Sequence, residues 1–237
     1  MIQATSDPWL AQVMSRPAYR ISGLLAPAEA DQLGAALAIA TAGPAFAYAR
    51  VPTHEVFTVQ ALESAGFRVV DSGVTFEMKS PAIQSDAKAP VRFAEKRDEG
   101  EVSRLARNAF KYSRFHLDPL VPREQADEIK AQWAANYFQG KRGDFMVVAE
   151  RAGEIAGFLQ LLKASSDTLV IDLIAVAEKH RGHGLATQMI RFAVCACGSF
   201  GRLQVGTQAA NVGSLQFYQR FGFGIMATSY VLHCHGS

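Results

Sequence analysis

The alternation of apolar and polar residues is most informative between residues 169 and 196. Leu169 to Val176 is a β-branched and apolar run interrupted only by Asp172, which predicts a buried strand. A short polar stretch with Gly182 and Gly184 follows. Apolar residues then recur at helical spacing, at Leu185, Met189, Phe192, Ala193 and Ala196. The pattern therefore predicts a strand, a glycine loop and a helix in direct succession.

Similar patterns along the rest of the chain favour a mixed α/β fold. Strands are expected at residues 18–22, 46–51, 73–78, 91–94, 145–150, 154–163, 203–207 and 225–233. Helices are expected at residues 27–41, 56–64, 97–110, 122–138 and 212–221. From residue 91 onward, the predicted order of elements is β-α-α-β-β-β-α-β-α-β.

Residues 80–90 have the Pro, Ala, Ser and Asp content of a linker. We therefore expect a small α/β domain at residues 1–88 and a second domain at residues 89–237. Segment 62–67 is similar to segment 218–223, because each ends in Gly-Phe and is followed by a predicted strand. The first domain is thus predicted to be a degenerate half of the same fold, and it lacks a comparable glycine loop.

Composition narrows the class of protein. The net charge is only +2 and 19% of the residues are charged, so the chain lacks the strong positive charge typical of nucleic-acid-binding proteins. We therefore expect no nucleic-acid partner. No stretch approaches 18 apolar residues and the first residues do not resemble a signal peptide, so we expect a cytoplasmic protein without a membrane partner. Three cysteines argue against a disulfide framework. Neither the two cysteines at 195 and 197 nor the stretch 233–235 has a known zinc spacing, so no metal is expected.

The glycine loop has the chemistry of an anion site. Glycines allow a bulky ligand to approach the backbone, and the first amides of a helix have no partner inside it. Together with the helix dipole, these amides suit a pyrophosphate. The loop matches neither the dinucleotide pattern G-x-G-x-x-G nor the P-loop pattern. We expect it to bind another nucleotide-like cofactor.

Two motifs resemble the GCN5-related N-acetyltransferase (GNAT) superfamily. The loop has the form Arg181-x-x-Gly184-x-Ala186 after a strand, similar to that family's coenzyme A loop. Further along the chain, the stretch from Asn211 to Phe223 has the form N-x-x-S-x-x-x-Y-x-x-x-G-F, similar to the family's second hallmark. The resemblance implies a GNAT fold whose fourth and fifth strands are parallel and splayed, with acetyl-CoA as cofactor. Its implied cofactor-binding residues are Ile174, Val176, Arg181, Gly182, His183, Gly184, Leu185, Ala186 and Asn211.

The resemblance also implies direct attack of a neutral amine on the acetyl thioester. A backbone N–H at the end of the fourth strand, that of Val176, is expected to bind the thioester oxygen. Tyr218 keeps its proton at neutral pH, so it is the expected hydrogen-bond or proton donor to the departing sulfur. Without the motif, Tyr218 would be interpreted as a core tyrosine.

Two residues are candidates for the general base. Asp172 is an acid on an otherwise apolar strand, and strict alternation places it on the same face as Ile174 and Val176. It either draws the proton from the amine or is a salt-bridged carboxylate. His116 is the second candidate, because an imidazole titrates near neutral pH.

The stretch 108–119, between the two predicted helices, is rich in chemically active side chains. It resembles the corresponding stretch of the nucleotide-sugar acetyltransferases similar to dTDP-fucosamine acetyltransferase, which acetylate a 4-amino-4,6-dideoxyhexose. The resemblance implies a small-molecule amine acceptor, a nucleotide sugar, and a possible homodimer. The implied substrate-binding residues are Lys111, Tyr112, Ser113, Arg114 and Phe115.

Other interpretations of the chain stay open. The loop at 108–119 could instead be a helix cap whose aromatic side chains fill the core. The acceptor could be a protein N-terminus or another small amine, although a cationic substrate would favour an acidic groove and this loop is net basic. A non-catalytic acyl-CoA-binding module is the remaining alternative, and it would not need Tyr218.

Overall fold

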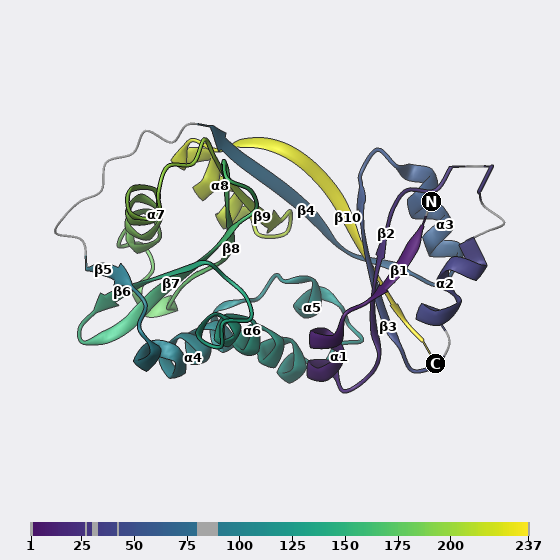
Figure 1. Cartoon of the computed structure of the whole chain (residues 1–237), viewed down its shortest axis with the longest axis horizontal. Helices are drawn as coiled ribbons and strands as arrows, with labels where there is room; N and C mark the ends of the chain where they lie inside the picture. Colours follow the sequence, from purple (N-terminus) through teal and green to yellow (C-terminus); the bar gives the residue numbers. More distant parts are fainter. Residues whose placement is uncertain (1, 27, 30–32, 42, 80–89, 237) are drawn as a thin grey trace.

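A computed structural model of the chain describes residues 2–26, 28–29, 33–41, 43–79 and 90–236 (Figure 1). Its strands are β1 (Gln3–Ser6), β2 (Ala18–Ser22), β3 (Phe46–Pro52), β4 (Arg68–Lys79), β5 (Val91–Phe93), β6 (Phe145–Arg151), β7 (Glu154–Lys163), β8 (Thr168–Val176), β9 (Arg202–Gln208) and β10 (Gly224–His235). Its helices are α1 (Pro8–Met14), α2 (Leu33–Thr41), α3 (Val56–Ser64), α4 (Glu99–Ala109), α5 (Arg114–Leu117), α6 (Arg123–Phe138), α7 (Leu185–Ala196) and α8 (Val212–Phe221), with 3-10 turns η2 (Lys96–Asp98) and η3 (Glu178–His180). The expected mixed α/β fold is confirmed.

Several predictions fall partly or wholly outside the described residues. The helix expected at 27–41 is described only as α2, from Leu33. The boundary expected between residues 88 and 89 lies in the segment 80–89, which is not described. Among the described residues, no helix is both long and apolar enough to cross a membrane.

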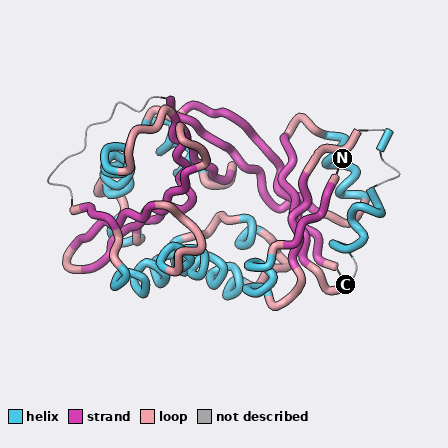
Figure 2. The backbone as a smooth tube through the Cα atoms, in the orientation of Figure 1, coloured by secondary structure: helices cyan, strands magenta, loops and turns pink. Residues whose placement is uncertain are grey.

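The described strands, magenta in Figure 2, form one ten-stranded sheet. The strand order in this sheet is β1-β2-β3-β10-β4-β9-β8-β7-β6-β5. β10 runs antiparallel between β3 and β4, and β4 pairs with β9 on its other side. The C-terminal strand thus extends the sheet of the N-terminal part, while β4 extends the sheet of the C-terminal part. Backbone hydrogen bonds therefore run without a break across the two halves of the chain.

Apolar side chains alternate between the two faces of this sheet, as a period of two requires. Val147 of β6 packs with Met189 and Ile190 of α7, on the face that also carries α8. Its neighbours in β6, Met146 and Val148, pack with α4 and α6 on the opposite face. The C-terminal part is therefore a three-layer structure with helices on both sides of the sheet.

A third apolar cluster joins the N-terminal helix to the middle of the chain. Leu10 and Met14 of α1 pack against Ile129 of α6 and Phe115 of α5. Neither α1 nor α5 was predicted from the sequence, because each is a short helix. Their packing holds α5 and α6 against β2 and β3.

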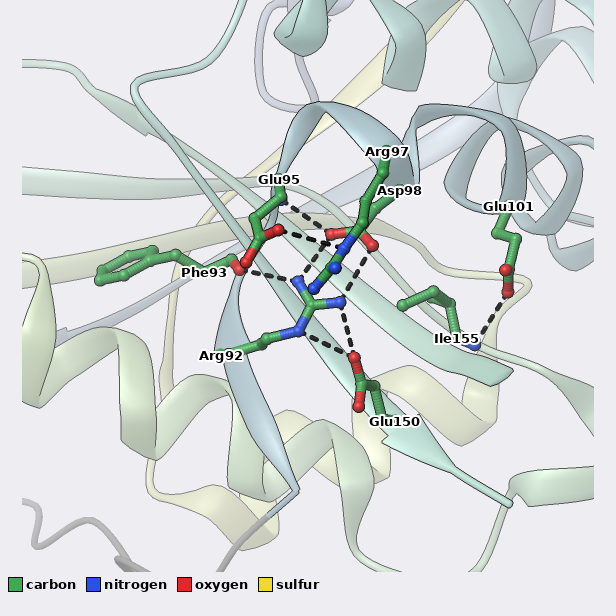
Figure 3. A network of polar contacts seen from close by, with 8 residues as sticks. All are labelled: Arg92, Phe93, Glu95, Arg97, Asp98, Glu101, Glu150 and Ile155. Carbon is green, nitrogen blue, oxygen red and sulfur yellow. Dashed lines mark hydrogen bonds and ion pairs between the residues drawn. The ribbon is translucent and has the colours of Figure 1, made fainter. Parts of the chain in front are cut away.

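The edge strand β5 is fastened by a charged network (Figure 3). Arg92 donates two hydrogen bonds to Asp98, at 2.7 and 2.9 Å, and one to Glu150 of β6, at 2.8 Å. The Asp98 carboxylate also accepts from the backbone N–H of Glu95, at 2.8 Å. A strand at the edge of a sheet pairs with a neighbour on one side only, and β5 pairs with β6. The network fixes the start of α4 against the sheet.

The loop after α5 is tied to β10 by Asp118. One oxygen of this carboxylate accepts from His233 Nδ1, at 2.7 Å, and from His235 Nε2, at 2.8 Å. The potential metal-ligand atoms of Asp118, His233 and His235 lie within 4.8 Å of one another, as in a metal site. However, Asp118 is already hydrogen-bonded to both rings, and the Arg16 guanidinium lies 2.9 Å from His235 Nδ1. A neighbouring cation disfavours a metal ion, and the arrangement is best interpreted as a structural tie.

Candidate active site

Strands β8 and β9 separate at the centre of the sheet. They are paired in parallel only from Thr168 and Arg202 to Ile171 and Val205. Beyond this point, β8 continues to Val176 and β9 continues to Gln208 without pairing to each other. The predicted splay of the two parallel strands is thus present.

The splay leaves backbone groups of β8 without a strand partner. The N–H of Ala177 donates to the carbonyl of Ala156, at 2.8 Å, on the β7 side. Because alternate residues of a strand direct their backbone groups to opposite edges, Ile174 and Val176 direct theirs toward β9. The carbonyl of Val176 accepts from Arg181 Nε, at 3.2 Å. A linear ligand with amide groups could pair with this edge as an added strand does.

The glycine loop that follows has an open cradle of backbone. Gly182 and Gly184 have φ angles of 79° and 76°, and a Cβ at either position would meet no atom within 4 Å. Gly184 caps α7 without any side-chain hydrogen bond to the first amides of the helix. These amides and the helix dipole therefore suit a pyrophosphate, and the residues present fit coenzyme A.

The loop, the end of β8 and helix α8 enclose a cavity of about 500 Å³. Among the residues singled out from the sequence, those that line it are Lys111, Tyr112, Ser113, Ile174, Val176, Arg181, Gly182, Gly184, Leu185, Ala186, Asn211 and Tyr218. His183 is not among them, and its Nδ1 lies 2.9 Å from the carbonyl oxygen of Arg181. The two sequence motifs, which α7 and β9 separate along the chain, thus meet around one space.

Helix α8 delivers Tyr218 to this cavity. The helix begins at Asn211, whose side chain accepts a hydrogen bond from the backbone N–H of Ser214, at 3.3 Å. Tyr218 is 3% exposed and its ring packs against those of Phe76, Phe217 and Phe223. Burial raises the pKa of Tyr218 above its ordinary value. Its hydroxyl therefore holds its proton at neutral pH and remains a donor.

The sequence prediction for the orientation of Asp172 is wrong. A β-bulge shifts the register between β7 and β8, so that Gln160 pairs with Leu173 while Leu161 pairs with Ile171. The extra residue reverses the alternation. Consequently, Asp172 points to the α6 face, whereas Ile174 and Val176 pack toward α7 and α8.

On that face, Asp172 is saturated with hydrogen-bond donors. Arg142 binds both carboxylate oxygens, each at 2.7 Å. Trp133 Nε1 donates at 2.8 Å and Gln160 Nε2 at 3.1 Å. Asp172 does not line the cavity that contains Tyr218. These contacts favour the ion-paired interpretation of Asp172 over that of a general base.

His116 is also engaged on both ring nitrogens. Its Nδ1 lies 2.6 Å from the Ser113 hydroxyl, and its Nε2 lies 2.9 Å from Asp127. Burial lowers the pKa of His116, although Asp127 opposes that effect. Ser113 lines the cavity, whereas His116 lies behind it. The imidazole is therefore placed to orient Ser113.

The predicted substrate residues divide between two places. Lys111, Tyr112 and Ser113 line the cavity of Tyr218. Phe115 is 1% exposed in the core cluster with α1 and α6, so it is a core residue that does not face a ligand. Arg114 turns away toward the N-terminal part of the chain, with its guanidinium carbon 3.8 Å from the centre of the Tyr48 ring.

Sequence reasoning missed several residues that line the cavity, namely Phe110, His180, Gln208, Ser214 and Phe217. His180 Nε2 lies 2.7 Å from Glu154 of β7, which holds the turn before the glycine loop. His180 could have been identified from the sequence by its position directly before the loop motif. No sequence pattern marked Gln208, which ends β9.

The comparisons with known proteins agree with this geometry. Residues 109–223 match the model of a family described as "Acetyltransferase (GNAT) family". A curated relative is the spore coat polysaccharide biosynthesis protein SpsD of Bacillus subtilis, 31% identical over 138 residues. This match covers 57% of the present chain and 47% of SpsD, so the chain spans about half the length of that relative.

Solved structures of low sequence identity share the fold. A GCN5-related N-acetyltransferase from Sphaerobacter thermophilus has a TM-score of 0.65 and 16% identity, covering 99% of this chain and 76% of that one. A tandem GNAT protein from the clavulanic acid biosynthesis pathway has a TM-score of 0.59 and 13% identity, covering 93% and 75%. The predicted fold class is confirmed. Residues 109–223, about half of the chain, thus match the GNAT family of acetyltransferases, and the chain shares the fold of solved GNAT proteins.

Proposed function

We propose that this enzyme transfers the acetyl group of acetyl-CoA to the 4-amino group of a nucleotide-linked amino-dideoxy sugar. The observation that carries the proposal is the convergence on one cavity of the glycine-loop amides, the unpaired edge of β8 and the Tyr218 side chain. The glycine loop and the first amides of α7 would hold the pyrophosphate, while Ile174 and Val176 would pair with the amides of the pantetheine arm.

Acetyl-CoA supplies the reactive thioester when it is bound. The N–H of Val176 faces the splay and would donate to the thioester oxygen, where negative charge develops during attack. The hydroxyl of Tyr218, kept protonated by burial, would donate to the departing sulfur. Asn211 would contact the pantetheine region while it caps α8.

The hydrogen bonds of the two candidate general bases, Asp172 and His116, argue against that role for either residue. Asp172 is bound to Arg142, Trp133 and Gln160, and His116 is bound to Ser113 and Asp127. Neither has a free acceptor lone pair facing the cavity. We infer that the acceptor amine enters neutral or loses its proton to water, and that Asp172 and His116 position their neighbours.

The choice of acceptor rests on two observations. Lys111, Tyr112 and Ser113 line the same cavity as Tyr218, so the segment that resembles nucleotide-sugar acetyltransferases borders the place where the amine must attack. In addition, the name of SpsD assigns that protein to polysaccharide biosynthesis. Both support a sugar acceptor over a protein N-terminus.

The proposal is tested by thiol release from acetyl-CoA with dTDP-4-amino-4,6-dideoxygalactose and its glucose epimer, with mass spectrometry of the nucleotide sugar. We expect one sugar to gain one acetyl group. Tyr218→Phe should lower kcat by about 100-fold or more, because it removes a proton donor, while the affinity for acetyl-CoA stays within about twofold. Tyr230→Phe on β10 is the matched control.

Absence of acetyl transfer to either sugar, in protein that binds acetyl-CoA, would refute the sugar acceptor. A Tyr218→Phe variant with the wild-type kcat would refute the role of the phenol.

A further inference from the structure

A second cavity of about 800 Å³ lies between the N-terminal elements α1, β2 and β3 and the helices α5 and α6. Figure 1 shows these elements grouped around the middle of the molecule. A cavity of this size has room for a ligand as large as a nucleotide. It is formed by residues from both halves of the chain.

The charge of this cavity is positive. Five cationic side chains line it, and the only acidic side chain among its lining residues is Asp7. The cations are Arg20, Arg50, Arg114, Lys141 and Arg142. Within the described part of the chain, Arg142 is paired with Asp172, whereas Arg20, Arg114 and Lys141 have no carboxylate within ion-pair distance. Arg50 lies near Asp71. Three of the five cations that line the cavity therefore have no ion-paired carboxylate among the residues that the structure describes.

A further cation lies in the wall between the two cavities. Lys130 of α6 is 8% exposed, and its ammonium lies over the rings of Phe110, at 4.9 Å, and Trp133, at 4.7 Å. Phe110 lines the cavity of Tyr218 and Trp133 lines the second cavity. Burial lowers the pKa of Lys130 to about 8; Asp172 opposes this effect, whereas Arg114 and Arg142 add to it. A ligand with negative charge would relieve this crowding of cations.

Aromatic side chains line the same space. The rings of Trp9 and Trp133 meet edge to face with centroids 5.5 Å apart, and both residues are half-buried lining residues, as is Tyr48. Aromatic faces next to arginines are suited to stacking a nucleobase beside its phosphates. This combination favours a nucleotide over a simple inorganic anion.

The two cavities meet at one point of the chain. Ser113 lines the cavity of Tyr218, and the next residue, Arg114, lines the second. Consecutive Cα atoms are about 3.8 Å apart. A ligand held by Arg114 is therefore close to the place where the acceptor amine must react.

We propose that the second cavity binds the nucleoside diphosphate portion of the acceptor, with Arg20, Arg114 and Lys141 on the phosphates and Trp9 or Trp133 against the base. This inference rests on the proposed function, because it assigns a place to one part of that acceptor. It gives the N-terminal part of the chain a role in substrate recognition.

The test is calorimetric titration of dTDP into protein saturated with coenzyme A, which blocks the glycine loop as a competing phosphate site. We expect binding at one site. The double variant Arg20→Gln/Lys141→Gln should raise the Kd for dTDP at least about tenfold, because charge-assisted hydrogen bonds to phosphate are lost. Both residues are exposed, so the fold should tolerate the change. In turnover, the KM for the sugar should rise while kcat and the KM for acetyl-CoA stay unchanged.

The matched control is Arg151→Gln/Arg191→Gln, which removes the same charge from exposed positions away from both cavities. Its Kd for dTDP should stay within about twofold of the wild-type value, as expected for surface sites. No binding of dTDP, an equal effect of the two double variants, or equal affinity for inorganic pyrophosphate would overturn the inference. Because binding is measured without turnover, this result is independent of whether the aminosugar is acetylated.

Discussion

The two cavities of this molecule are built in opposite ways. The cavity of Tyr218 is lined by three short segments, 109–113, 174–187 and 208–218, and on its glycine-loop side by backbone and small residues. The second cavity is lined by long charged and aromatic side chains from α1, β2, β3, α5, α6 and the loop that follows α6. The glycine-loop side of the first cavity depends on the local conformation of the chain, whereas the whole second cavity depends on how distant segments pack.

This difference has a physical origin. A pyrophosphate can be held by amides that every residue carries, so the chain needs only glycines and a helix start in sequence. A site formed from arginines needs each guanidinium to be held in place by its own neighbours, such as Tyr48 beside Arg114 and Asp172 beside Arg142. The second cavity should therefore be the more sensitive to changes in its supports.

The largest expected effect of a single substitution on stability is that of Asp172→Asn. Loss of the carboxylate leaves Arg142 with one partner fewer, and we expect a loss of about 2 kcal/mol in the free energy of unfolding, less than for a fully buried pair. Because Asp172 lies outside the cavity of Tyr218, kcat per folded molecule should fall less than about threefold. Urea denaturation and steady-state kinetics give the two values.

Glu124→Gln, an exposed change at the start of α6, is the control and should alter stability by less than about 0.5 kcal/mol. A stable Asp172→Asn protein whose kcat is about 100-fold lower would restore Asp172 as the base.

The next largest effect is expected for Gly184→Ala, which tests whether the backbone of the glycine loop binds the phosphates. Gly184→Ala places a Cβ at a φ of 76°, in the open space where the phosphates are expected. We expect a loss of stability of about 1 kcal/mol, since Ala is strained at positive φ, and a loss of about tenfold in affinity for coenzyme A. Gly153 in the β6–β7 turn has a φ of 79° and equally open surroundings, so Gly153→Ala is a matched control.

In the control, stability should fall by a similar amount while the affinity for coenzyme A stays unchanged. Equal affinities for coenzyme A in the two variants, measured by calorimetry, would contradict the proposed position of the pyrophosphate.

The smallest effect concerns the dependence of stability on pH, to which His233 and Asp71 contribute; both lie near Arg114 of the second cavity. Burial lowers the pKa of His233, beside Asp118, to about 4. The unfolded state then binds more protons between about pH 6.5 and pH 4, so this residue destabilises the fold as the pH falls through that window. Burial raises the pKa of Asp71, near Arg50, to about 6. Here the folded state binds more protons between about pH 6 and pH 3.8, so stability rises as the pH falls.

The two contributions oppose each other in the wild-type protein. Between pH 7 and pH 5.5, His233→Gln should therefore lose less stability than the wild-type protein, and Asp71→Asn should lose more, each by about 1 kcal/mol. Denaturation at pH 7, 6.25 and 5.5 measures the three slopes. Identical slopes would show that neither group titrates as its burial requires.

Much of the fold was predictable because the hydrophobic period is local. The expected helices 56–64 and 212–221 and the expected strand 154–163 coincide with α3, α8 and β7. The expected strand 73–78 is part of the longer strand β4, which already begins at Arg68. The chain segments that carry the clearest periodicity gave the most accurate bounds, whereas the short helices α1 and α5 gave no periodic signal.

The parts that could not be predicted depend on partners distant in sequence. Insertion of β10 between β3 and β4 is decided by pairing between the last strand of the chain and strands from its first third. The bulge at Asp172 arises from the register with β7, and a single extra residue reversed the face of this side chain. Arg114 follows Ser113 directly, yet the two side chains line different cavities.

The order of residues was enough to specify the strand, the glycine loop, the two helices and the family to which they belong, because backbone conformation and amide chemistry follow from neighbouring residues. Which side chains share a cavity was settled only by the packed fold, because that depends on register, on a bulge and on contacts between segments that lie far apart in the chain. The candidate cofactor site could therefore be predicted before the fold was known, whereas the basic cavity beside it could not.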